Sequence, residues 1–128
     1  MTTTLTKIVQ DVFNKELQGH ILGCYQLETI DADTEIYCEV AGQELELRDQ
    51  PYDFMETALE SWQDDSLDKP LYNKYKDFKV VKEYAIGLKG VNLDEERFTL
   101  VVSESIALIA YFDCASPGGF WVHKEIQL

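Results

Sequence analysis

Residues 21–48 read ILGCYQLETIDADTEIYCEVAGQELELR, and this stretch decides the fold. Apolar and β-prone residues alternate there with polar ones, and turn-forming pairs interrupt them at Ala32-Asp33 and Ala41-Gly42. Alternation with a period of two between such turns is typical of antiparallel strands joined by tight hairpins. The stretch therefore predicts a three-stranded antiparallel meander.

Two-residue turns would also set the register of this meander. Cys38 would then lie opposite Leu27, and Glu39 would lie opposite Glu44, where two like charges repel each other. Because that repulsion does not favour folding, a face rich in carboxylates around Tyr37 is a candidate surface for binding a partner. Its members are Glu28, Glu35, Tyr37, Glu39, Glu44 and Glu46.

Helical periodicity appears on both sides of the meander. An apolar stripe over residues 5–17 predicts an N-terminal helix that ends near Gly19. A second helix is expected after Gln50, with Pro51 at its first helical position. Its buried stripe would contain Phe54, Met55, Ala58, Leu59 and Trp62. Its exposed stripe adds four further candidate residues for partner binding, Asp53, Glu56, Glu60 and Asp64.

The C-terminal half contains four apolar segments, which we predict to be strands. They cover residues 80–88, 98–103, 106–112 and 120–126. The segment 106–112 also suits a buried helix, but its length and the turn after it favour a strand. Residues 66–78 suit either a loop or a short third helix. The whole pattern predicts a single α+β domain over residues 1–128, with an N-terminal helix, the meander, a second helix and about four further antiparallel strands.

Negative charge is concentrated in one part of the chain. The protein has 24 acidic and 11 basic residues, for a formal charge of −13. Fourteen of the carboxylates lie between residues 28 and 68, where Arg48 is the only base. This charge would repel the phosphates of a nucleic acid but would speed the capture of a basic protein. The alternative explanation is that it only keeps the protein soluble.

Cysteine and histidine offer little for catalysis. A hairpin around residues 116–117 would place His123 near Ala110 and away from Cys114, so a catalytic dyad is not expected. Cys24 and Cys38 should be reduced and buried, because the three cysteines lack the spacing of a metal site or a disulfide framework. No nucleophile, phosphate-binding or zinc motif occurs. We therefore expect no enzyme, no metal and no cofactor.

The sequence also suggests where the protein resides. Its longest apolar stretch, residues 106–112, is much shorter than a membrane span. The N-terminal residues lack the pattern of a signal peptide. A cytoplasmic protein without a membrane partner is therefore expected.

These features lead to three hypotheses for function. The first is a small acidic protein-binding module, such as an inhibitor, an immunity protein or a nucleic-acid mimic, that docks on a basic nuclease or nucleic-acid-binding protein with Tyr37 as an anchor. The second is a chaperone or adaptor, because the order of helix, three strands and helix resembles that of small acidic secretion chaperones. The third is a ligand-binding domain or small enzyme with a pocket formed by Tyr111, Trp121 and His123.

Overall fold

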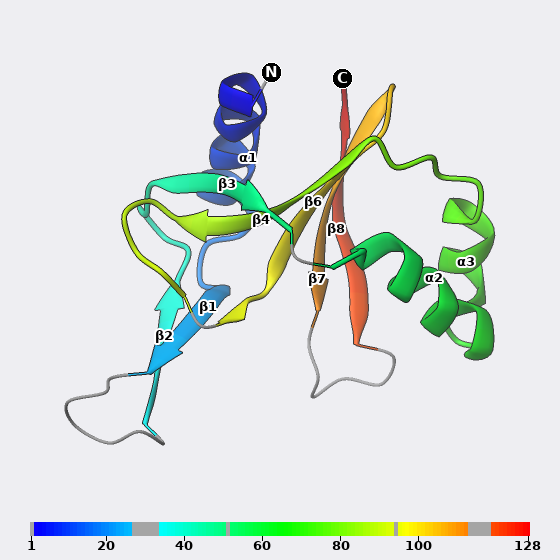
Figure 1. Ribbon diagram of the computed structural model, residues 1–128, viewed down its shortest axis with the longest axis horizontal. Helices are drawn as coiled ribbons and strands as arrows, with labels where there is room; N and C mark the ends of the chain where they lie inside the picture. The colour runs from blue at the N-terminus through cyan, green and yellow to red at the C-terminus, as the bar shows by residue number, and fades with distance from the viewer. Residues whose placement is uncertain (1, 27–33, 51, 94, 113–118) are drawn as a thin grey trace. The chain divides into compact units, whose positions relative to one another are not determined.

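A computed structural model of the protein describes residues 2–26, 34–50, 52–93, 95–112 and 119–128 (Figure 1). These residues form three helices and eight strands in two antiparallel sheets, which confirms the expected α+β class. The strand orders are β2-β1-β5 and β3-β4-β6-β7-β8. The elements are α1 (Thr2–Glu16), β1 (Ile21–Gln26), β2 (Glu35–Glu39), β3 (Leu45–Asp49), α2 (Phe54–Asp64), α3 (Lys69–Tyr75), β4 (Lys82–Leu88), β5 (Glu95–Glu96), β6 (Phe98–Val102), β7 (Ile106–Phe112) and β8 (Phe120–Gln127).

The chain divides into two compact units, each built from two separate segments. The first unit contains Met1–Arg48 and Ala85–Phe98, and the second contains Asp49–Tyr84 and Thr99–Leu128. The chain therefore passes from one unit to the other within β3, within β4 and within β6.

The first unit contains the predicted N-terminal helix. The apolar stripe of α1 is buried through Leu5, Val9, Phe13 and Leu17, as its period requires. The Phe13 ring packs edge-on against Phe98, with the ring centroids 5.0 Å apart.

The predicted meander is wrong in the register of its first hairpin and in the place of its third strand. β1 and β2 form the expected antiparallel hairpin, but Cys38 faces Gly23 and not Leu27, and Tyr37 faces Cys24. β3 is not in this sheet and lies beside β4 in the other one, so Glu39 does not face Glu44. The first predicted turn, at Ala32-Asp33, lies outside the described residues.

Main-chain hydrogen bonds give the physical reason why β3 leaves β2. The Gln10 side chain on α1 donates to the Gln43 carbonyl and accepts from the Leu45 N–H, each at 2.8 Å. The Lys89 N–H donates to the Glu44 carbonyl at 2.8 Å. The main-chain groups of residues 43–45 are therefore hydrogen-bonded to α1 and to Lys89. They are not available to form a ladder with β2.

Gly23 is required by the close approach of β5 to β1. A Cβ atom at this position would lie 2.3 Å from the Glu95 carbonyl oxygen. We expect Gly23→Ala to lower the free energy of unfolding by about 1–3 kcal/mol, because β5 must shift to make room. Urea denaturation would measure this loss. Gly19→Asn is the comparison: a Cβ atom there meets nothing within 4 Å, and asparagine tolerates the φ of +85° at Gly19 better than most residues with a side chain, so this variant should lose less stability. Wild-type stability of Gly23→Ala would contradict the close approach.

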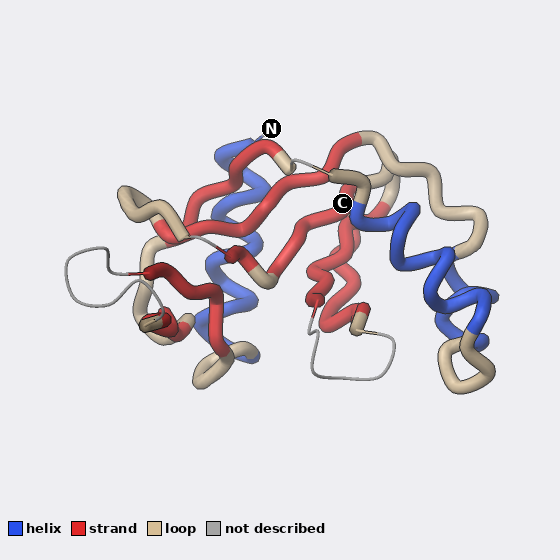
Figure 2. Tube along the Cα trace, turned by 60° about the horizontal axis from the view of Figure 1, so that its bottom comes forward, coloured by secondary structure: helices blue, strands red, loops and turns tan. Residues whose placement is uncertain are grey.

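The second unit contains α2 and α3, which lie side by side in both views (Figures 1 and 2). Trp62 is fully buried, and its indole N–H donates to the Phe120 carbonyl at 3.0 Å. Leu59 is only partly buried, in contrast to the prediction. The buried cluster contains Phe54, Met55, Ala58, Trp62, Tyr75, Val101, Leu108 and Ala110.

The predicted C-terminal strands are confirmed as β4, β6, β7 and β8. Residues 106–112 form a strand, and the polar segment 66–78 contains the short helix α3. The prediction omitted β5, because its two residues, Glu95 and Glu96, are polar and show no strand pattern. α2 begins at Phe54, three residues after Pro51, which lies outside the described residues.

Candidate functional site

The exposed face of α2 presents four carboxylates in one row. The row, called the acidic helix face below, consists of Asp53, Glu56, Glu60 and Asp64, which are all exposed as predicted. Their spacing places them on one side of the helix, away from the buried Phe54, Met55, Ala58 and Trp62. Within the described residues, none of the four forms an ion pair.

Glu83 caps the start of α2. The N–H groups of Phe54 and Met55 donate to its two carboxylate oxygens, each at 2.9 Å. Asp53 occupies the N-cap position, yet its side chain forms no capping hydrogen bond. Asp53 therefore remains on the acidic helix face because a buried glutamate from β4 does the capping.

Burial raises the pKa of Glu83 above its ordinary value, while the two N–H groups oppose the rise and the Asp53 charge adds to it. The sequence prediction missed this residue. The only local indication is that Glu83 lies two residues before the buried Ala85, so the two side chains share one face of β4.

Edge strand β2 carries the second group of predicted residues. Glu35, Tyr37 and Glu39 are exposed on alternate positions, as the period of a strand requires. The Tyr37 hydroxyl donates to a Glu35 carboxylate oxygen at 3.1 Å, and this hydrogen bond raises the pKa of Tyr37. The Arg97 guanidinium lies 5.8 Å from the Tyr37 ring centroid. This edge is therefore acidic around one half-exposed aromatic ring.

The remaining predicted residues do not join either group. Glu44 lies directly before β3 and pairs with Lys89 at 3.0 Å. Glu46 belongs to an ion-pair network in the same unit, and Glu28 lies outside the described residues. The single carboxylate face that the sequence predicted is therefore not formed.

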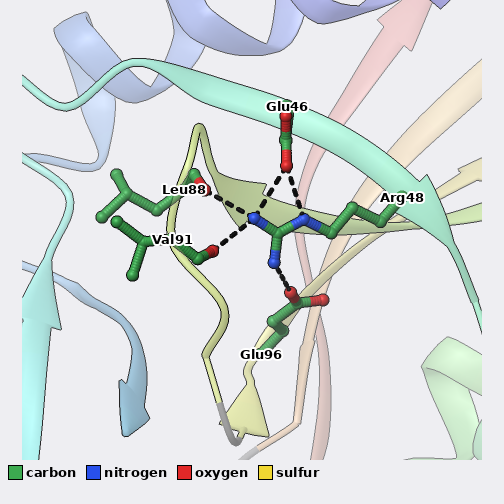
Figure 3. Close-up of polar contacts among 5 residues, drawn as sticks. All are labelled: Glu46, Arg48, Leu88, Val91 and Glu96. Atoms are coloured by element: carbon green, nitrogen blue, oxygen red, sulfur yellow. Dashed lines mark hydrogen bonds and ion pairs between the residues drawn. The ribbon is translucent and has the colours of Figure 1, made fainter.

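Arg48 is the centre of that network (Figure 3). Its guanidinium contacts a Glu46 carboxylate oxygen at 2.8 Å and a Glu96 oxygen at 2.6 Å. It also donates to the Leu88 carbonyl at 2.6 Å and to the Val91 carbonyl. A Cβ atom on Gly87 would lie 2.7 Å from the guanidinium carbon. All three guanidinium nitrogens of Arg48 therefore have partners within the first unit.

The two described cysteines have no feature of a nucleophile. Cys24 and Cys38 are free; Cys24 is buried as expected, whereas Cys38 is only partly buried. Burial raises the pKa of Cys24, and its thiol donates to Glu95 at 3.6 Å, which also favours the neutral thiol. Cys114 lies outside the described residues, and the His123 ring packs edge-on against Tyr111 at 5.5 Å.

Comparisons of the chain with protein-family models, curated proteins and solved structures find no match. No helix in the described part of the chain is long and apolar enough to cross a membrane. Those described residues also bring together no group of three or more side chains that could hold a metal ion.

Proposed function

We propose that this protein is a small acidic protein-binding module whose acidic helix face docks on a basic partner, such as a nuclease or a nucleic-acid-binding protein. An inhibitor, an immunity protein or a nucleic-acid mimic would act in this way. One observation supports the proposal most directly: the four carboxylates are exposed and form no ion pair with any described residue, while Arg48, the only base between residues 28 and 68, is bound within the first unit. The β2 edge offers a second contact surface on the first unit.

Helix stability alone does not explain the composition of this face. Asp53 and Glu56 gain from the helix dipole at the N-terminus of α2. Glu60 and Asp64 lie in the second half of the helix, where the dipole disfavours negative charge and where the last turn contains no base. Glu56 also repels Glu60, and Glu60 repels Asp64, each at i,i+4 spacing. These costs support a role for the carboxylates outside folding.

The geometry suits a row of cations on a partner. The positions 53 to 64 extend over roughly 16 Å at the rise of an α-helix. Exposed carboxylates without internal counter-ions act at a distance, so they steer a basic protein before contact. Such steering raises the association rate and weakens as salt is added.

The test is the association rate of the partner with a charge-neutral variant. The partner is captured from the native cell, identified and purified, and its association is followed across a salt series. Glu60→Gln combined with Asp64→Asn should slow association about fivefold at low salt and flatten its salt dependence. The free energy of unfolding should stay equal or rise slightly, because two unfavourable charges are gone.

Glu104→Gln combined with Asp77→Asn is the matched control, since both residues are exposed in the second unit and lie outside α2. It removes the same amount of charge and should have a much smaller effect on association. An acidic partner, or equal effects of the two double variants, would contradict the proposal.

A further inference from the structure

A hollow of about 390 Å³ opens in the second unit at the start of the acidic helix face. Gln50, Tyr52 and Asp53 line it from the segment before α2, and residues 80–83 line it from the segment that leads into β4. Asp53 therefore belongs to both the hollow and the acidic helix face.

Three exposed apolar side chains gather at this hollow. Tyr52 is 50% exposed, Val80 is 42% exposed and Val81 is 63% exposed. Exposed apolar side chains that cluster beside polar groups are characteristic of surfaces that bind a partner. The hollow thus combines an aromatic ring and two aliphatic side chains on its wall.

Two carboxylates also line the hollow. Asp53 and Glu83 form no ion pair within the described residues. Glu83 is only 8% exposed, and its two oxygens already accept the N–H groups of Phe54 and Met55, so Asp53 is the exposed carboxylate of the hollow. Lys82 also lines the hollow, but its ammonium pairs with Asp49 at 3.3 Å and lies 5.7 Å from the Tyr84 ring centroid.

We propose that this hollow binds the side chain of an arginine that the basic partner presents. The inference rests on the proposed function and names the anchor of that interface. A guanidinium stacks on an aromatic ring and donates hydrogen bonds in its plane to a carboxylate, while its methylene stem contacts aliphatic side chains. Tyr52, Asp53, and Val80 with Val81 supply these three kinds of contact. A lysine ammonium lacks both the planar fork and the stacking surface.

An NMR titration with a single arginine tests this inference. The probe is the peptide Ac-Gly-Arg-Gly-NH2, compared with matched peptides that contain lysine or the neutral arginine analogue citrulline. The arginine peptide should shift the amides of Tyr52, Asp53 and residues 80–83 saturably, with at least about threefold higher affinity than the lysine peptide. The citrulline peptide should not bind. Equal shifts with all three peptides would overturn the inference.

Variants locate the binding site. Tyr52→Ala should weaken binding of the arginine peptide at least about threefold, because the stacking surface is lost. Asp53→Asn should weaken it as well and serves as an independent variant if Tyr52→Ala does not fold. Trp121→Ala is the matched control, since Trp121 is also a half-exposed aromatic of the second unit, at 45%. Equal effects of Tyr52→Ala and Trp121→Ala would overturn the inference.

A hexa-arginine peptide separates this inference from the proposed function. If it shifts the amides of α2 but not those of the hollow, and Tyr52→Ala has no effect, then the arginine pocket is wrong and the acidic docking face stands. If it shifts neither region, both proposals fail.

Discussion

Replacing Glu83 by alanine should lower the free energy of unfolding by about 2–4 kcal/mol, because two buried N–H groups at the start of α2 lose their acceptor. Phe54 and Met55, which carry these groups, are 0% and 2% exposed, so water has little access to replace the carboxylate. The loss is measured by urea denaturation with tryptophan fluorescence, since Trp62 is in the same helix. Glu56→Ala, on the exposed side of α2, is the control and should change stability much less.

The pH dependence of stability tests the same carboxylate. Because the pKa of Glu83 is raised by folding, its protonated form contributes stability that is present in acid and lost as pH rises from about 4.5 through the folded pKa. Glu83→Gln keeps the shape but leaves one N–H without an acceptor, and it cannot ionise. The difference in unfolding free energy between wild type and this variant should therefore be largest in acid and shrink as pH rises through that window. A deficit that grows with pH would show that folding lowers the pKa.

Arg48→Met should cost about 2–4 kcal/mol of unfolding free energy in the first unit. Burial alone would lower the pKa of Arg48, but hydrogen bonds and charge from Glu46 and Glu96 outweigh it and raise the pKa. Without the guanidinium, Glu96 and the carbonyls of Leu88 and Val91 all lose a donor. The Glu96 side chain is only 16% exposed, so solvent compensates poorly. Chemical denaturation would quantify the loss.

Lys89→Met provides the matched comparison for this prediction. Lys89 also pairs with a carboxylate of the first unit, but it is 60% exposed and its partner Glu44 is 71% exposed. Exposed pairs of this kind contribute at most about 1 kcal/mol and are screened by salt. Arg48→Lys should recover only part of the stability, because an ammonium cannot reach all four acceptors. Equal losses in Arg48→Met and Lys89→Met would contradict the central role of Arg48.

Local periodicity explains which parts of the structure the sequence predicted well. The buried and exposed stripes of α2 follow from the helical repeat, so the acidic helix face was predicted residue by residue. The exposed positions of β2 follow in the same way from alternation. In both elements, the side on which a residue lies depends only on its close neighbours in sequence.

The features that the sequence did not predict depend on pairing between residues that are distant in the chain. Alternation shows that residues 45–49 form a strand, but it does not identify β4 as the neighbour. Arg48 bonds Glu96, which is 48 residues away, and Glu83 bonds Phe54, which is 29 residues away. The residues next to Arg48 and Glu83 in the sequence do not indicate which distant residue each of them will bind. The hollow beside Tyr52 was missed for the same reason, since its two segments meet only in the folded chain.

The chain crosses between the two units three times. This has one consequence for folding during translation and another for recombination of the gene. When Arg48 leaves the ribosome, Glu96 and Phe98 have not been synthesised, so Arg48 and Phe13 each lack a partner from their own unit. By the time Phe98 emerges, both helices of the second unit are already outside.

No continuous stretch of the gene encodes either unit. Exchange of gene segments between related proteins at a single junction would therefore always divide a unit, and the two units are expected to be inherited together.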